Sequence, residues 1–268
     1  MNIRAKLFVV AMCALLSTAA FAAMNGPTGL ALDSKGNLYV ANFGSNQIQV
    51  YATTHKQVKN KTITQGVSGP LSIAIDSQDQ LWVANYSSNI VWVYSAGRPL
   101  TNYSNGVFSP TAIAVDPAGT IYLVDAASTL NIYDPFFNIV NALSYDQVEP
   151  GSSALYGVAA SRTGAVAFGS NAAYSLTYAA DVVGQSHTDY LGRIPVDGGR
   201  AIAFAGNDFY IGLGNGTIMK NSKSLMTLPY IPSGMAVDGV RGYVYLSNNS
   251  ANSVDMYSVT GAYIGTIH

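Results

Sequence analysis

The stretch PTGLALDSKGNLYVANFGSNQIQVY, residues 27–51, decides the fold because the chain repeats it. Clear copies are PLSIAIDSQDQLWVANYSSNIVWVY at residues 70–94, PTAIAVDPAGTIYLVDAASTLNIY at 110–133 and PSGMAVDGVRGYVYLSNNSANSVDMY at 232–257. Two looser copies begin at Leu155 and Gly199. A repeat of roughly constant period predicts a ring or stack of equivalent structural units.

Each copy divides into short strands separated by turns. In the first copy, an apolar run over 30–32 ends at Asp33, and strands are predicted over 38–40 and 48–51, with a looser fourth strand near 62–64. Four antiparallel strands make one propeller blade. The sequence therefore predicts an all-β, six-bladed β-propeller of four-stranded antiparallel blades that begin near residues 27, 70, 110, 155, 199 and 232. The predicted domain begins with a first strand and ends with a fourth strand over 264–267. We therefore expect the first and last blades to pack side by side, without sharing a strand.

The first residues are predicted to lie outside this fold. Arg4 and Lys6 precede an apolar run over 7–16, and Ala20-Phe21-Ala22 resembles a cleavage site, which is typical of a secretory signal peptide. We expect residues 1–22 to be this signal, residues 23–268 to be one domain, and the protein to be secreted or periplasmic. The only cysteine, Cys13, lies in the signal, so the domain has no disulfides.

Charge is scarce along the whole chain. Thirteen Lys and Arg side chains stand against 14 Asp and Glu, and Glu149 is the only glutamate. Nucleic-acid binding is not expected, since it needs dense basic residues. The apolar run over 7–16 is short for a bilayer-spanning helix, so stable membrane insertion is not expected either. A monomer is predicted.

The repeats carry a family resemblance. The pattern P-x-G-[ILM]-A-[LIV]-D, followed by Gly-x-[LI]-[YW]-V-A-[ND] and an Asn before I-x-V-[YF], resembles the NHL repeat. The resemblance implies a six-bladed propeller. NHL-like propellers include scaffold and binding modules, and related folds include gluconolactonase or senescence-marker lactonases, streptogramin lyases and peptide-amidating lyases. A fold alone does not choose among these activities.

The enzyme relatives can be compared position by position. The lactonase resemblance implies axial metal ligands at the x of P-x-G, but these positions hold Thr28, Leu71, Thr111, Tyr156, Arg200 and Ser233. Hard cations need several oxygen ligands, usually with carboxylates. The lyase resemblance implies a histidine site, but His55, His187 and His268 are scattered. Asp33, Asp76, Asp116 and Asp238 are interpreted as turn residues within their own blades. No metal, no cofactor and no catalytic residue is therefore predicted.

Two rings of residues remain as candidates for binding. The ring that enters the first strands contains Thr28, Thr111, Tyr156, Arg200 and Ser233, and Tyr156 and Arg200 follow the long loops over 145–154 and 185–198. The rim between second and third strands contains Asn42, Asn85, Asp125 and Asn248. Each rim residue has a second interpretation, in which it caps nearby loop N–H groups.

The function favoured by these residues is a non-catalytic binding or scaffold module for a protein or glycan, which uses the loop face. The alternative is a diverged hydrolase or lyase of the lactonase or streptogramin-lyase type.

Overall fold

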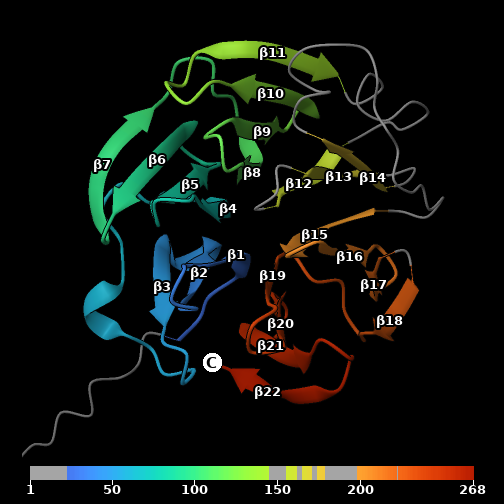
Figure 1. Ribbon diagram of the computed structural model, residues 1–268. Coiled ribbons are helices and arrows are strands. Elements are labelled where there is room, and N and C mark those ends of the chain that lie inside the picture. The colour runs from blue at the N-terminus through green and yellow to red at the C-terminus, as the bar shows by residue number, and fades with distance from the viewer. Residues whose placement is uncertain (1–22, 145–154, 162–164, 171–173, 179–197, 222) are drawn as a thin grey trace, which may run out of the picture.

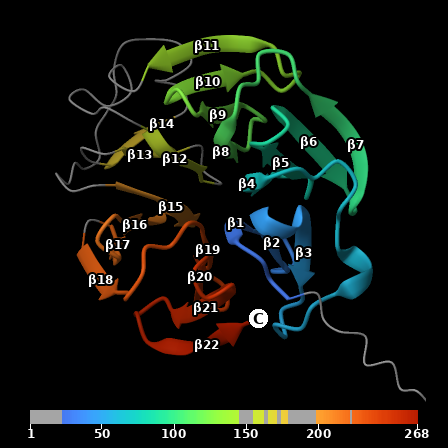
Figure 2. The same cartoon turned by 180° about the vertical axis from the view of Figure 1, so that it is seen from behind.

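The computed structural model describes residues 23–144, 155–161, 165–170, 174–178, 198–221 and 223–268. These residues form six antiparallel sheets set around a common centre (Figures 1 and 2). The β-propeller expected from the repeats is confirmed, and each sheet corresponds to one copy of the repeat. Within the described ranges no helix is long and apolar enough to cross a membrane.

In each sheet the first strand lies nearest the centre and later strands lie progressively outward (Figure 1). The first three sheets are β1 (Pro27–Leu32), β2 (Leu38–Asn42), β3 (Gln47–Tyr51); β4 (Pro70–Ile75), β5 (Leu81–Asn85), β6 (Ile90–Ser95), β7 (Arg98–Tyr103); and β8 (Pro110–Val115), β9 (Ile121–Asp125), β10 (Thr129–Tyr133), β11 (Ile139–Ser144).

The remaining sheets are β12 (Leu155–Ala160), β13 (Ala165–Ser170), β14 (Tyr174–Tyr178); β15 (Gly198–Ala205), β16 (Asp208–Leu213), β17 (Thr217–Lys220), β18 (Lys223–Thr227); and β19 (Met235–Asp238), β20 (Tyr243–Asn248), β21 (Ser253–Ser258), β22 (Tyr263–Ile267). Two single-turn 3₁₀ helices, η1 (Phe43–Ser45) and η2 (Lys59–Lys61), lie in the first repeat.

The prediction of a fourth strand in the first blade is wrong. Instead of a strand near 62–64, the chain makes isolated bridges from Ile48 to Ile63 and from Tyr51 to Gln57. The 3₁₀ turn η2 lies between the two bridges and breaks the extended backbone that a continuous ladder needs. The fourth blade has three described strands, and the residues that would follow β14 lie outside the described ranges.

The turns between first and second strands follow the predicted chemistry. The Asp33 carboxylate accepts from the backbone N–H groups of Lys35 and Asn37, at 3.0 and 2.8 Å. Asp76 accepts equivalent bonds from Gln78 and Gln80, both at 2.9 Å. Asp116 and Asp238 close their own turns in the same way. The interpretation of these aspartates as turn residues is confirmed.

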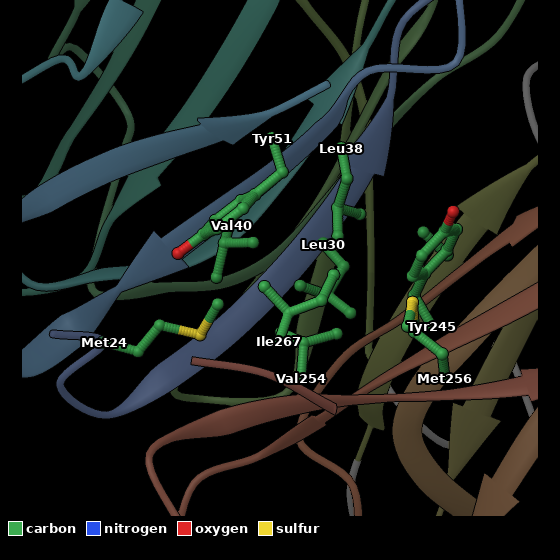
Figure 3. Packing of buried hydrophobic residues seen from close by; sticks show 10 residues of the cluster. Met24, Leu30, Leu38, Val40, Tyr51, Tyr245, Val254, Met256 and Ile267 are labelled. Atoms are coloured by element: carbon green, nitrogen blue, oxygen red, sulfur yellow. The ribbon is translucent and has the colours of Figure 1, made fainter. Parts of the chain in front are cut away.

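The core lies between blades rather than within a single centre. Because each sheet is buried on both sides, its apolar side chains pack against the two neighbouring sheets. The cluster between the first and last blades joins the two ends of the chain, as Figure 3 shows, and contains Met24, Leu30, Leu38, Val40, Tyr51, Ala236, Tyr245, Val254, Met256 and Ile267.

Ring closure follows the sequence prediction. Among the described residues, the last sheet contains only strands from the C-terminal repeat, β19 to β22, and the first contains only β1 to β3. The two sheets meet through side chains, with Ile267 of the last strand and Met24 ahead of the first strand both buried in the seam.

Candidate functional site

The ring predicted at the first-strand entries meets at the centre of the propeller. Thr28, Leu71, Thr111, Tyr156 and Ser233 all line one central cavity, together with Gly29, Leu30, Ser72, Ile73, Ala112, Ile113, Val158, Ile202, Gly234 and Met235. Arg200 lies on β15, but its side chain is outside the described part of the structure. The sequence therefore identified five of the residues that face the axis.

The central cavity is small. Its volume is about 70 Å³. Pockets that enclose organic ligands usually have volumes of about 300–1,000 Å³. The cavity bounded by the described residues is therefore smaller than a typical enclosed ligand pocket.

The hydroxyl groups of the ring mostly join neighbouring blades. Thr28 donates to the Pro70 carbonyl at 2.8 Å, which ties the first blade to the second. Ser233 donates to the Pro27 carbonyl at 3.0 Å, which ties the last blade to the first. Thr111 donates within its own blade, to the Val124 carbonyl at 3.1 Å. All three hydroxyls are thus engaged in hydrogen bonds that hold the inner strands in place.

Close packing of neighbouring backbone explains why the P-x-G motif contains glycine. A Cβ on Gly29 would lie 2.8 Å from the Ile73 backbone nitrogen, and a Cβ on Gly234 would overlap the Thr28 carbonyl. Real Cβ atoms essentially never approach other atoms so closely. Glycine at these positions therefore lets adjacent inner strands come together around the axis.

The predicted rim residues are turned inward. Asn42 and Asn85 have no exposed surface. The Asn42 side-chain oxygen accepts from the Asn25 backbone N–H at 3.2 Å, and that of Asn85 accepts from the Ser68 backbone N–H at 2.8 Å. Both amides thus hold the segment that enters their own blade.

The other two rim residues serve the loops that follow them. Asp125 accepts from the Thr129 backbone N–H at 2.9 Å and from the Asn131 side chain at 3.1 Å. The Asn248 oxygen accepts from the Ala251 N–H at 3.1 Å. The geometry matches the capping interpretation, and a ligand-binding role for any rim residue stays a prediction.

A second set of asparagines clamps each loop to the next blade. The N–H of Gly69 donates to the Asn46 side chain at 2.6 Å, that of Ser109 to Asn89 at 2.7 Å, and that of Gly26 to Asn252 at 2.8 Å. All three asparagines have positive φ, between 51° and 57°, a conformation that asparagine tolerates well. The signal was present in the sequence as the Asn before I-x-V, but its inter-blade role could not be derived from it.

Ionisable groups are dispersed in the described structure. Among these residues, no three His, Cys, Asp or Glu side chains gather closely enough to hold a metal ion. His187 and Glu149 lie outside the described ranges, and His268 is exposed at the end of the chain.

His55 lies at the seam between the first and last blades. Its Nε2 lies 3.1 Å from the Tyr245 hydroxyl, and its ring meets Tyr243 edge to face at 5.3 Å. Burial lowers the pKa of His55, because the charged imidazolium loses hydration there. His55 is half-buried here because the loop after β3 folds back onto the last blade.

Comparisons with known proteins agree with the fold. The NHL repeat model matches residues 24–51, and no curated protein sequence matches the chain. Similar solved structures include a chain of hydrazine synthase from Kuenenia stuttgartiensis, with 12% identity, a TM-score of 0.63 and coverage of 91% of this chain and 98% of that one.

Two lyase structures have the same architecture. A streptogramin B lyase is 13% identical, with a TM-score of 0.59 and coverage of 91% and 83%. The virginiamycin B lyase from Staphylococcus aureus is 15% identical, with a TM-score of 0.54 and coverage of 87% and 80%. At these identities the likeness concerns the fold alone. The chain is thus a β-propeller whose first repeat, residues 24–51, matches the NHL repeat.

Proposed function

We propose that the protein is an exported, non-catalytic binding module that holds a protein or glycan on the face carrying the first-strand entries. This entry face comprises the loops that enter the first strands and the loops that join second to third strands. The antiparallel order of the strands brings both sets of loops to one end of every blade.

The observation that carries the proposal is the chemistry of the central cavity. Where the lactonase resemblance implies metal ligands, Thr28 and Ser233 donate their hydroxyl protons to carbonyls of neighbouring blades. The cavity of about 70 Å³ is also too small to enclose an organic substrate. Recognition on this scaffold is therefore assigned to the open loop face, where binding sites on rigid folds commonly lie.

Export rests on the apolar run and small residues within residues 1–22. It is tested by fractionating cells of the source organism and determining the N-terminal residue of the purified protein. A mature N-terminus at Ala23 or Met24 in an extracytoplasmic fraction is expected. An intracellular protein that retains Met1 would contradict this part of the proposal.

The choice of face can be tested by blocking one face at a time. In a Cys13→Ala background, Ser45→Cys places a single thiol on the entry face and Val240→Cys places one at the opposite end, where Val240 is 93% exposed. Each thiol is coupled to a polyethylene glycol maleimide of about 5 kDa, and co-sedimentation with envelope material of the source organism is measured.

We expect the entry-face block to reduce co-sedimentation at least tenfold and the Val240 block to leave it unchanged. Equal recovery of both coupled proteins would contradict a binding role for the entry face. Metal analysis of the same preparations tests the alternative: a stoichiometric transition metal would favour a lyase-type or lactonase-type enzyme.

A further inference from the structure

In the described part of the structure, the loops at the two ends of the propeller differ in charge. The described loops of the entry face are 23–27, 42–47, 64–70, 85–90, 104–110, 125–129, 213–217, 227–235 and 248–253, and Asp125, which is buried, is the only ionisable acid or base among them apart from tyrosine. The opposite end carries exposed charges in its turns, including Lys35, Asp79 and Arg241. His268, the last residue, lies at the outer strand of the entry end beside Ile267, which pairs with Val254.

Aromatic side chains project from these described loops. Phe43 and Tyr86 occupy equivalent positions after β2 and β5, and each is 37% exposed. Phe108, just before β8, is 61% exposed. Their neighbours in the same loops are small and polar, with exposed Ser45, Ser87 and Asn105 between them.

The three aromatic residues stand on loops that are locked to one another. The Asn46 clamp joins the Phe43 loop to Gly69, and the carbonyl of Gly69 accepts from the Tyr86 N–H at 2.9 Å. The Asn89 clamp joins the Tyr86 loop to Ser109, the residue after Phe108. A surface held in this way loses little conformational entropy when it binds.

The arc continues across the closing seam. Asn252 of the last blade accepts from the Gly26 N–H, and the Gly26 carbonyl accepts from the Phe43 N–H at 2.9 Å. The exposed loop over 249–251 therefore adjoins the Phe43 loop. The arc runs from the last blade through the first and second blades to the entry of the third.

From this arrangement we infer that the arc of loops 249–252, 43–46, 86–89 and 105–109 binds a neutral glycan. Pyranose rings present C–H faces that stack on aromatic rings, and their hydroxyls both donate and accept hydrogen bonds, as serine hydroxyls and asparagine amides do. The lack of exposed charge on these loops disfavours nucleic acid and acidic polysaccharides, which are held mainly by cations. Arginine, which commonly anchors protein interfaces, is absent from the four loops of the arc.

This inference rests on the proposed function and specifies its ligand. The test screens the purified full-length protein against an array of neutral and acidic oligosaccharides, and then measures the affinity of each hit in 0.05 and 0.5 M NaCl. The variants are Phe43→Ala combined with Tyr86→Ala, and Val240→Ala as a matched loss of an exposed apolar side chain at the opposite end.

We expect at least one neutral glycan to bind with an affinity that changes less than twofold between the two salt concentrations. The double variant should weaken this binding at least tenfold, while Val240→Ala leaves it unchanged. Circular dichroism and thermal unfolding establish that each variant is folded; if the double variant is not, Tyr86→Ser alone replaces it with an expected loss of at least threefold.

Binding to acidic glycans alone, no glycan binding at all, or binding that is insensitive to the arc variants would overturn the inference. The face-blocking experiment distinguishes failure of the glycan inference from failure of the proposed function. If no neutral glycan binds but the entry-face block still abolishes co-sedimentation, the glycan inference fails and the proposed function stands. If the block also has no effect, both fail.

Discussion

At the scale of single residues, polar side chains join the blades to one another. Asn46, Asn89 and Asn252 adopt positive φ and accept a backbone proton from the next blade. In the third copy the equivalent residue is Ser128, which has a similar φ of 61° but a shorter side chain than asparagine. One polar position of the repeat thus provides the hydrogen bonds that join neighbouring blades, although its residue type alone indicates only a loop.

The Asn46 clamp gives the first testable prediction. Asn46→Ala removes the acceptor of the Gly69 N–H and places alanine at φ 52°, so it should lower the free energy of unfolding by about 1–2 kcal/mol. Asn46→Asp keeps an acceptor oxygen and should stay within about 0.5 kcal/mol of the wild type. Urea unfolding measures both, and equal loss in the two variants would argue against the hydrogen bond as the cause.

The axial glycines give a second prediction. Gly234→Ala should prevent closure of the inner ring or cost about 4 kcal/mol or more, because its Cβ would overlap the Thr28 carbonyl. Gly97→Ala is the control for backbone strain without a clash: Gly97 has a φ of 78°, unlike Gly234, but nothing lies within 4 Å of its Cβ position. The control should cost only about 1 kcal/mol in thermal unfolding. Similar losses in both variants would contradict the close-packing explanation.

At the scale of elements, the sequence was sufficient where the local pattern and the tertiary structure agree. The apolar runs and the Asp turns predicted the inner three strands, since these are short, buried on both faces and bounded by turn residues. It was insufficient for the outer edge of the first blade. There, η2 and two isolated bridges take the place of the continuous strand expected near 62–64, and no alternation of side chains distinguishes an outer strand from an irregular segment.

The turn between β4 and β5 gives a third prediction. The Asp76 carboxylate accepts from two backbone N–H groups and, at 2.8 Å, from the indole nitrogen of Trp82, a residue that packs between the second and third blades. Asp76→Ala should therefore reduce the free energy of unfolding by about 2–4 kcal/mol. Gln78→Ala in the same turn should change it by less than about 0.5 kcal/mol. A near-neutral Asp76→Ala variant in urea unfolding would show that the turn forms without its carboxylate.

The candidate site was only partly accessible from the sequence. Equivalence of the repeats correctly brought Thr28, Leu71 and Tyr156 to the axis, because symmetry fixes their positions. It did not show that the ring hydroxyls are mostly bonded between blades, or that Asn42 and Asn85 are buried. Those properties depend on how blades approach one another, which the sequence of one repeat does not contain.

At the scale of the whole molecule, the ring is closed by a seam of side chains rather than by a shared strand. Apolar residues from both ends of the chain fill the seam (Figure 3), and His55 packs there against Tyr243 and Tyr245. The last blade also carries the ion pair of Arg241 with Asp238, and Arg241 donates a hydrogen bond to the Lys35 carbonyl of the first blade. The free energy of unfolding should therefore depend on the protonation state of groups in this seam.

The seam gives a prediction about pH. The pKa of His55 is lowered in the folded protein, so the neutral imidazole is favoured there. Its contribution to stability is present above the unfolded pKa of about 6.5 and is lost as the pH falls through the lower folded value. His55→Asn, which tolerates the φ of 61°, should show a smaller decrease in the free energy of unfolding between pH 7.5 and 5 than the wild type. Parallel pH profiles would contradict a role for His55 titration.

The central claim is that the entry face, whose described loops between strands carry no exposed charge, is the binding face. Hydrogen–deuterium exchange of the protein, free and saturated with the tightest neutral glycan on the array, tests it most directly. Slower exchange is expected in residues 43–46, 86–89 and 105–109, with unchanged exchange in the opposite turns over 33–37 and 76–80. Protection confined to those opposite turns, or a ligand that slows exchange at neither end, would contradict it.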